Sequence, residues 1–191
     1  MAPSEQTALK DHLLDIASSL FYAHGIRAVG VDLIVAEAGV AKTSLYRHFR
    51  TKDDLIAAFL GREDQQFWQT WQEVADRYAD NAGAELDAHL EWIGARLARP
   101  NYRGCPQINA VAEFSDPKHP ARKIAADHKA EMRRRLKTIA VRLGSDRPDE
   151  LAGQLALLIN GAFVSAGMLA PEEAIPLLQN AARLLLAGHG S

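Results

Sequence analysis

The sequence predicts an all-α protein with about nine helices. Among its 191 residues, 33 are alanine and 23 are leucine, whereas valine, isoleucine and threonine together number 23. Because β-branched side chains lose χ1 freedom in a helix, this composition favours helices over strands. Apolar residues also recur with the 3.6-residue period of a helix in several segments. With 48% hydrophobic and 24% charged residues, the chain resembles globular proteins rather than disordered or fibrous ones.

Three helices are expected in the first 50 residues. The first is predicted over residues 4–24, and Gly25 ends it. A short second helix is expected over residues 31–38, ended by Gly39, and a third over residues 42–49. Two short helices joined by a turn that contains glycine form a helix-turn-helix unit, whose second helix enters the major groove of DNA.

The third helix and the residues after it concentrate positive charge. Between Gly39 and Lys52 the chain has four lysine or arginine residues and no acidic residue. Such a run is usually a solvated helix face, but beside a helix-turn-helix pattern it predicts donors for phosphates and base edges. The candidate DNA-binding residues are Lys42, Thr43, Ser44, Tyr46, Arg47, His48 and Lys52.

Six further helices are expected after residue 52. Asp53 and Asp54 open a long fourth helix, because acidic side chains in a first turn interact favourably with the helix dipole. Pro171 suits a first turn, so a ninth helix is predicted to begin there, with Pro176 delaying its start or kinking it. The predicted ranges are 53–78, 83–97, 106–114, 121–143, 148–169 and from residue 171 onward.

Several function classes are disfavoured. The single cysteine, Cys105, excludes an internal disulfide and fits a reducing, cytoplasmic environment. The stretch Leu151–Pro171 is uncharged, but glycine, glutamine and asparagine residues interrupt it, so no membrane span is expected. The seven histidines lack zinc-motif spacing, and no nucleophile–base pair stands out. We therefore expect no metal, no cofactor and no enzymatic activity.

Four spaced motifs run through the helix-turn-helix segment, after a helix that ends in glycine. They are Ile34-Val35, Ala38-Gly39-Val40, Leu45-Tyr46-Arg47-His48-Phe49 and Lys52-Asp53-Asp54-Leu55. This pattern resembles the DNA-binding domain of the tetracycline-repressor (TetR) family. The resemblance implies a DNA-binding domain over residues 1–52 and an effector-binding and dimerisation domain over residues 53–191. It also implies phosphate contacts by Tyr46, His48 and Lys52, with base reading by Lys42, Thr43 and Ser44.

The middle helices carry large aromatic side chains with a few polar ones between them. Ordinary core packing explains many of these residues. The family resemblance implies in addition a largely apolar effector pocket with a few polar groups that orient the ligand. The residues expected to line it are Trp68, Trp71, His89, Trp92, Asn109, Phe114, Asn160 and Phe163. Residues 103–114 and His119-Pro120 also resemble a subgroup of the family.

A homodimer is expected through the eighth and ninth helices. The uncharged stretch would be apolar most of the way round a helix, which is hard to leave at the surface of a monomer. The predicted interface residues are Leu155, Ile159, Ala162, Phe163 and Ala166. Cys105 has two interpretations: a buried unreactive thiol, or a redox-responsive thiol beside Arg103 at a helix N-terminus.

These features together predict a DNA-binding transcriptional regulator of the cytoplasm. It would be a repressor that a small apolar effector releases from double-stranded operator DNA. Two alternatives stay open. The helical DNA-binding protein could be regulated only through a protein partner, or through oxidation of Cys105.

Overall fold

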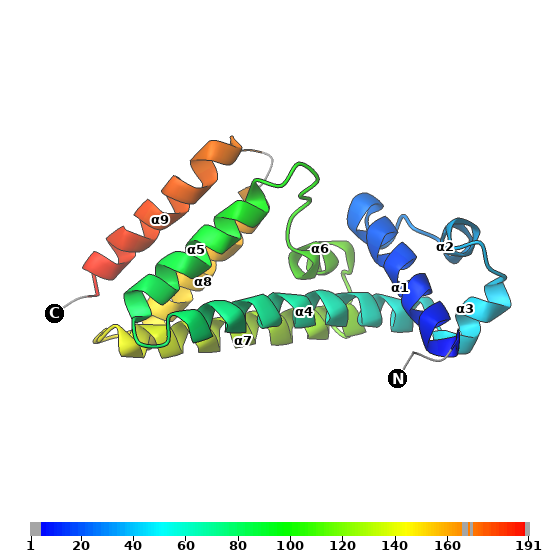
Figure 1. The fold of residues 1–191 in the computed structure, drawn as a ribbon, viewed down its shortest axis with the longest axis horizontal. Coiled ribbons are helices and arrows are strands. Elements are labelled where there is room, and N and C mark those ends of the chain that lie inside the picture. Colours follow the sequence, from blue (N-terminus) through cyan, green and yellow to red (C-terminus); the bar gives the residue numbers. More distant parts are fainter. Residues whose placement is uncertain (1–4, 166–167, 169, 190–191) are drawn as a thin grey trace. The chain divides into compact units, whose positions relative to one another are not determined.

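The computed structural model describes residues 5–165, 168 and 170–189, and this part of the chain is helical throughout, without a strand (Figure 1). The predicted all-α class is confirmed. The helices are α1 (Glu5–His24), α2 (Val31–Glu37), α3 (Lys42–His48), α4 (Lys52–Arg77), α5 (Ala82–Leu97), α6 (Pro106–Glu113), α7 (Pro120–Arg142), α8 (Pro148–Ser165) and α9 (Pro171–Ala187).

The predicted helix ends agree with the structure to within about one residue, except at α8. For α8 the structure gives Pro148–Ser165, and residues 166, 167 and 169 of the predicted range lie outside the described residues. Gly25 and Gly39 have positive φ angles of 91° and 66°, so they end their segments in the left-handed conformation that glycine adopts without strain. Pro176 does not delay α9, which begins at Pro171 and continues through it. Of the described helices, none is long and apolar enough to cross a membrane.

The chain divides into two compact units, and the division differs from the predicted boundary at residue 52. The first unit contains residues 1–65 and 106–125, and the second contains residues 66–105 and 126–191. Helix α6 and the start of α7 therefore belong with the helix-turn-helix segment. The physical reason is a shared core, because Ala110 and Ala121 are fully buried in the same hydrophobic cluster as Ile34 and Leu45.

The side chain of Glu113, at the end of α6, connects α6 to the turn that follows α1. Its carboxylate accepts hydrogen bonds from the backbone N–H groups of Ile26 (3.1 Å) and Arg27 (2.7 Å), immediately after α1. The Arg27 guanidinium in turn donates to the carbonyl oxygen of Glu113. Two N–H groups in the turn after α1 are thereby satisfied by a residue more than 80 positions away in the sequence.

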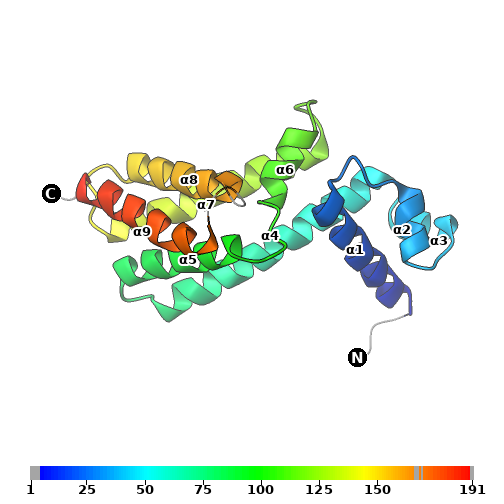
Figure 2. The same ribbon diagram turned by 90° about the horizontal axis from the view of Figure 1, so that it is seen from above.

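The second unit is built on α5, which packs against both α8 and α9 (Figure 2). Gly94 permits the close approach of α9. A Cβ atom at Gly94 would lie only 3.1 Å from the Cα atom of Ile175, so a larger residue there would push the helices apart.

We expect the change Glu113→Gln to destabilise the first unit. An amide keeps one acceptor oxygen but turns an N–H group toward a backbone N–H group, which costs about 1–3 kcal/mol for the unsatisfied donor. Thermal unfolding followed by circular dichroism measures this loss. The control is Glu91→Gln on the exposed face of α5. Equal melting temperatures for the two variants would contradict the role given to Glu113.

Candidate functional site

Helix α3 has one buried and one exposed face. Leu45 is fully buried, and Phe49, which caps the helix at its C-terminal end, is also in the core. Lys42, Thr43, Tyr46 and Arg47 are exposed, whereas Ser44 and His48 are half-buried. The structure thus brings six of the seven predicted DNA-binding residues together on one short helix, which contains no acidic residue.

The first residue of α3 is tied to the neighbouring helix. The Lys42 ammonium lies 2.7 Å from a carboxylate oxygen of Asp32 on α2, and this contact raises the pKa of Lys42. Both side chains remain exposed to solvent, so the pair contributes little to stability. Lys42 can therefore exchange Asp32 for a nucleic-acid acceptor at little cost.

Lys52, the seventh predicted DNA-binding residue, is the first residue of α4. Its ammonium donates a hydrogen bond to the carbonyl oxygen of Ile26 (2.7 Å) and lies 5.8 Å from the centre of the Phe21 ring. Burial lowers the pKa of this lysine. Lys52 thus links the start of α4 to the turn after α1.

The residues predicted for a dimer interface are mostly internal. Leu155, Ile159 and Phe163 are at most 2% exposed, so their side chains pack inside their own chain and cannot reach a second copy. Ala162 is half-buried, and Ala166 lies outside the described residues. The sequence showed that α8 is apolar, but periodicity alone does not tell which apolar face meets the protein's own core.

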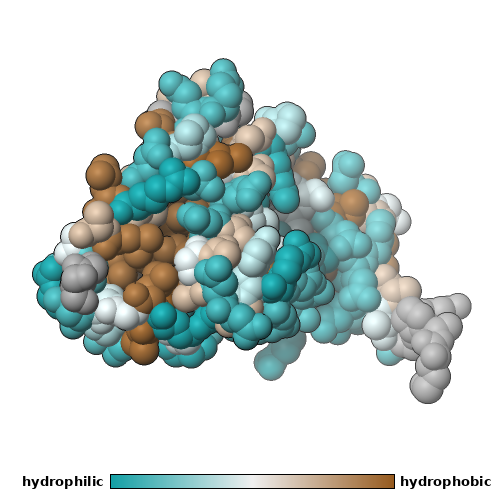
Figure 3. All heavy atoms as spheres, turned by 60° about the vertical axis from the view of Figure 1, so that its left-hand side comes forward, coloured by the Kyte–Doolittle hydropathy of each residue, from teal (hydrophilic) through white to brown (hydrophobic). Residues whose placement is uncertain are grey.

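A different face of α8 and α9 is exposed and apolar. Leu157 and Val164 on α8 are 73% and 56% exposed, and Leu177 and Leu184 on α9 are 51% and 76% exposed. In each pair the residues are seven positions apart, which is two helical turns, so they share a face. On the side that Figure 3 presents, hydrophobic residues gather in one part of the second unit, among hydrophilic ones.

Aromatic rings form a packed cluster in the second unit. The Phe67 ring lies 4.9 Å from that of Trp68, 6.1 Å from that of Trp71 and 4.8 Å from that of Trp92. Trp68 also contacts His128, whose ring is 4.9 Å away. The three tryptophans predicted to line an effector pocket thus lie together, and Trp71 is almost completely buried.

Two of the residues predicted for that pocket belong to the first unit. Phe114 packs against the hydrophobic cluster that contains Leu45, and its ring stacks on His119 at 3.8 Å. Asn109 lies in α6, which belongs to the first unit as well. The prediction therefore combined residues of both units, because sequence position does not show that α6 packs with the helix-turn-helix segment.

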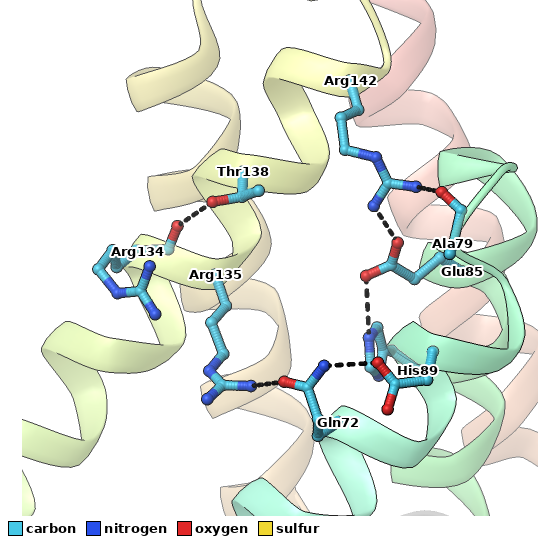
Figure 4. A network of polar contacts seen from close by, with 9 residues as sticks. Gln72, Ala79, Glu85, His89, Arg134, Arg135, Thr138 and Arg142 are labelled. Carbon is cyan, nitrogen blue, oxygen red and sulfur yellow. Dashed lines mark hydrogen bonds and ion pairs between the residues drawn. The ribbon is translucent and has the colours of Figure 1, made fainter.

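A buried polar network lies beside the aromatic cluster (Figure 4). His89 is fully buried, stacks on Trp71 at 3.8 Å and lies 3.6 Å from a carboxylate oxygen of Glu85. Glu85, also buried, forms an ion pair with Arg142. Burial, together with the positive charge of Arg135, lowers the pKa of His89 from 6.5 to about 3, so this histidine is neutral at physiological pH.

The two remaining predicted pocket residues, Asn160 and Phe163, lie near a second polar group. The ammonium of Lys129 is 5.2 Å from the centre of the Phe163 ring and 3.5 Å from the sulfur of Cys105. Burial lowers the pKa of Lys129. Lys129 and Asn160 both line a cavity of about 530 Å³ between α7 and α8.

Sequence reasoning missed Glu113, Lys129 and Arg133. Glu113 lies within the segment whose resemblance to a subgroup was noted, so that motif was its available signal. Lys129 and Arg133 are four residues apart on α7, which places them on one helix face. That spacing is common on solvated helices, and only the cavity distinguishes the pair.

Helix α3 is short and exposed on one face, follows a turn that contains glycine, and packs on a small hydrophobic core. This arrangement defines a helix-turn-helix protein. Residues 13–59 match the family model described as "Bacterial regulatory proteins, tetR family". The regulator QacR from Staphylococcus aureus is 34% identical over 106 residues, which are 56% of this chain and 53% of QacR. The chain thus spans about half the length of QacR, and it spans about a third of the length of the repressor KstR2 from Mycolicibacterium smegmatis.

Solved structures show the likeness over nearly the whole chain. SCO4454, a TetR-family transcriptional regulator from Streptomyces coelicolor, superposes with a TM-score of 0.92 and 29% identity over 97% of each chain. A cysteine variant of the TetR-family regulator CifR, in complex with a 26-base-pair operator DNA, has a TM-score of 0.80 and 21% identity over 91% of this chain and 94% of that chain. The family-model match covers the helix-turn-helix segment of this chain, and the chain as a whole has the fold of TetR-family regulators.

The low pKa of His89 gives the second unit an acid sensitivity. Between pH 6.5 and about 3 the unfolded chain binds a proton at His89 that the folded chain does not bind. Each pH unit lost in this window should therefore lower the free energy of unfolding by about 1.4 kcal/mol. The variant His89→Phe, which retains a ring against Trp71, should show a shallower decline than the parent.

Urea unfolding at pH 6.5 and at about pH 5 measures how much stability the parent and the His89→Phe variant each lose. Both pH values lie within the range in which the unfolded chain, but not the folded chain, binds a proton at His89. The control is His24→Gln, which alters an exposed histidine at the end of α1. If His89→Phe and the parent lost stability equally over this range, His89 would not be the group responsible.

Proposed function

We propose that this protein is a DNA-binding transcriptional repressor that a small molecule releases from its operator. The observation that carries the proposal is the exposed face of α3, where hydroxyl, phenol and cationic side chains share a helix without acidic residues. Hydrogen-bond donors of this kind contact phosphates and base edges when a recognition helix enters the major groove. The operator complex of CifR, which has the same fold, supports double-stranded operator DNA as the partner.

Helix-turn-helix proteins bind operators that consist of two half-sites, and each half-site is contacted by one copy of the protein. A homodimer is therefore part of the proposal. The exposed apolar face of α8 and α9 supports it. Leu157 and Val164 lie on either side of Gly161, which is itself exposed and has no side chain to hold a neighbouring helix away. This face replaces the internal residues that the sequence predicted.

Helix α4 gives the proposed effector a route to the DNA. Its residues 52–65 belong to the first unit, and its residues 66–77 belong to the second, where Trp68 and Trp71 lie. A ligand that binds the second unit more tightly in one arrangement of α4 than in another shifts the population of the DNA-binding state. Coupling free energies of about 1–3 kcal/mol are typical of such effects.

The alternative of regulation by oxidation has one observation in its favour. The sulfur of Cys105 lies 3.5 Å from the ammonium of Lys129, so a charged group is in contact with this thiol. Against it, Cys105 is only 6% exposed. Loss of operator binding on treatment with hydrogen peroxide, abolished by Cys105→Ser, would select this alternative over release by a ligand.

The division of contacts on α3 predicts two kinds of DNA-binding defect. Tyr46→Phe and Arg47→Gln should weaken binding to operator and unrelated DNA alike, because phosphate contacts carry no sequence information. Thr43→Ala should weaken the operator by about 1–3 kcal/mol and change base preference. Fluorescence anisotropy with DNA from upstream of the protein's own gene, against shuffled DNA, measures both.

The control for these measurements is Arg77→Gln, at the far end of α4 in the second unit. Full operator affinity in all three α3 variants would show that α3 is not the reading helix. No preference of the parent protein for any genomic fragment over shuffled DNA would refute the proposed function itself.

The proposed dimer face predicts which surface residues control assembly. Val164→Asp on α8 or Leu184→Asp on α9 should convert the dimer to a monomer of about 21 kDa, because a buried unpaired carboxylate is strongly unfavourable at an apolar contact. Light scattering measures the mass. Val141→Asp on α7, where the side chain is also 56% exposed, is the matched control and should leave the dimer intact. A parent protein that is monomeric at micromolar concentration would overturn the dimer.

A further inference from the structure

A cavity between α7 and α8 in the second unit has an asymmetric lining. It has a volume of about 530 Å³, which lies within the range of small-molecule sites. Two cationic side chains of α7, Lys129 and Arg133, line it from one helix. The facing helix α8 contributes the apolar side chains of Ala156 and Leu157 and the backbone of Gly153.

Among the residues that the structure describes, neither cation forms an ion pair with an acidic side chain. The ammonium of Lys129 contacts the Cys105 sulfur and the Phe163 ring, and neither is a carboxylate. The Arg133 guanidinium lies over Gly153, where a Cβ atom would be 3.7 Å away, and among the described residues it has no ion pair. Arg133 is exposed, whereas Lys129 is half-buried, so it is Lys129 that loses hydration without an equivalent gain from a counter-charge.

The acidic residues that line the same cavity are already paired with other cations. Asp149 lies 2.9 Å from the ammonium of Lys137, and Glu150 accepts a hydrogen bond from Arg147 at 3.0 Å. Glu150 also accepts a hydrogen bond from the amide of Gln154. These carboxylates therefore do not neutralise Lys129 and Arg133, and the positive charge at this end of the cavity remains available to a ligand.

Asn160 adds an unsatisfied polar group next to the cations. Its side-chain carbonyl oxygen is buried, and among the described residues it has no hydrogen-bond partner. Rotation of the amide by half a turn would place N–H donors at the same position. Buried polar groups in proteins are nearly always hydrogen-bonded, so this amide is expected to find its partner in a bound molecule.

We propose that this cavity binds a small organic carboxylate with an apolar body. The carboxylate lies between Lys129 and Arg133 with a hydrogen bond from Asn160, and the apolar body lies along Ala156 and Leu157. This assignment rests on the proposed release by an effector and specifies its chemical class. It also moves the ligand from the packed aromatic rings to the α7–α8 cavity. Because Leu157 also belongs to the proposed dimer face, a second copy would border the cavity.

The charge of the ligand can be tested separately from its shape. Isothermal titration of the full-length protein, without DNA, would compare 4-phenylbutyrate with the uncharged 4-phenylbutyramide, and octanoate with octanamide. We expect the acids to bind about tenfold or more tightly than the amides, because each charge-assisted hydrogen bond is lost in the amide. Equal affinity of acid and amide, or no binding of either acid at millimolar concentration, would overturn the proposal.

Matched variants locate the site. Lys129→Met and Arg133→Gln should each weaken the binding of the acids about tenfold or more, and Ala156→Phe should abolish it by filling the cavity. Arg134→Gln removes the same charge from the next residue of α7, outside the cavity lining, and should bind as the parent does. Circular dichroism melting confirms that each variant is folded. Normal binding by a folded Lys129→Met variant would overturn the assignment.

Addition of the same acids to the protein–operator complex then tests the effector role. Release of the DNA by an acid, prevented by Lys129→Met, supports both the site and the proposed function. Binding without any release supports the site but contradicts the role as effector. Operator binding by the parent protein in the absence of acid tests the repressor function independently of the cavity.

Discussion

The first unit depends on a single peptide segment that is held from two sides. The N–H groups of Ile26 and Arg27 donate to the Glu113 carboxylate, and the carbonyl oxygen of Ile26 accepts from the Lys52 ammonium. The turn after α1 is thereby fixed to the end of α6 and to the start of α4. Buried or half-buried charges are tolerated there because each has a hydrogen-bond partner. The position of α3 on this core follows, since Leu45 fills the same hydrophobic cluster.

This arrangement also distributes positive charge between structure and function. Lys52 donates a hydrogen bond to the backbone of its own unit, and Lys42 is held by an exposed ion pair that solvent already weakens. Arg47 and Tyr46 remain exposed on α3. A protein whose net charge is −2 can therefore present a local positive surface to DNA. Its affinity should depend on salt, as expected when phosphate contacts release counterions.

The helices were predictable from the sequence because their signals are local. Glycine at positions 25 and 39 ends helices through its own backbone freedom, and the apolar period determines which face of α3 is buried. The partners of those faces were not predictable. Phe163 was expected both in a pocket and at an interface, and it lies in the core of its own unit. For Lys52 the spacing identifies a cation but not the protein acceptor that it meets, which is the carbonyl oxygen of Ile26.

The buried charges of the second unit divide into a satisfied set and an unsatisfied set. Glu85 is paired with Arg142, and the neighbouring His89 avoids the cost of burial by remaining neutral. In the described part of the chain Lys129 contacts a thiol and an aromatic ring, which compensate an ammonium less well than a carboxylate does. A binding partner that supplies the missing negative charge gains the interaction that the chain itself does not make. If α7 and α8 must move to enclose this ligand, the ligand binds the enclosed conformation more tightly than the open one. A difference in affinity of this kind is what any ligand needs to shift a conformational equilibrium.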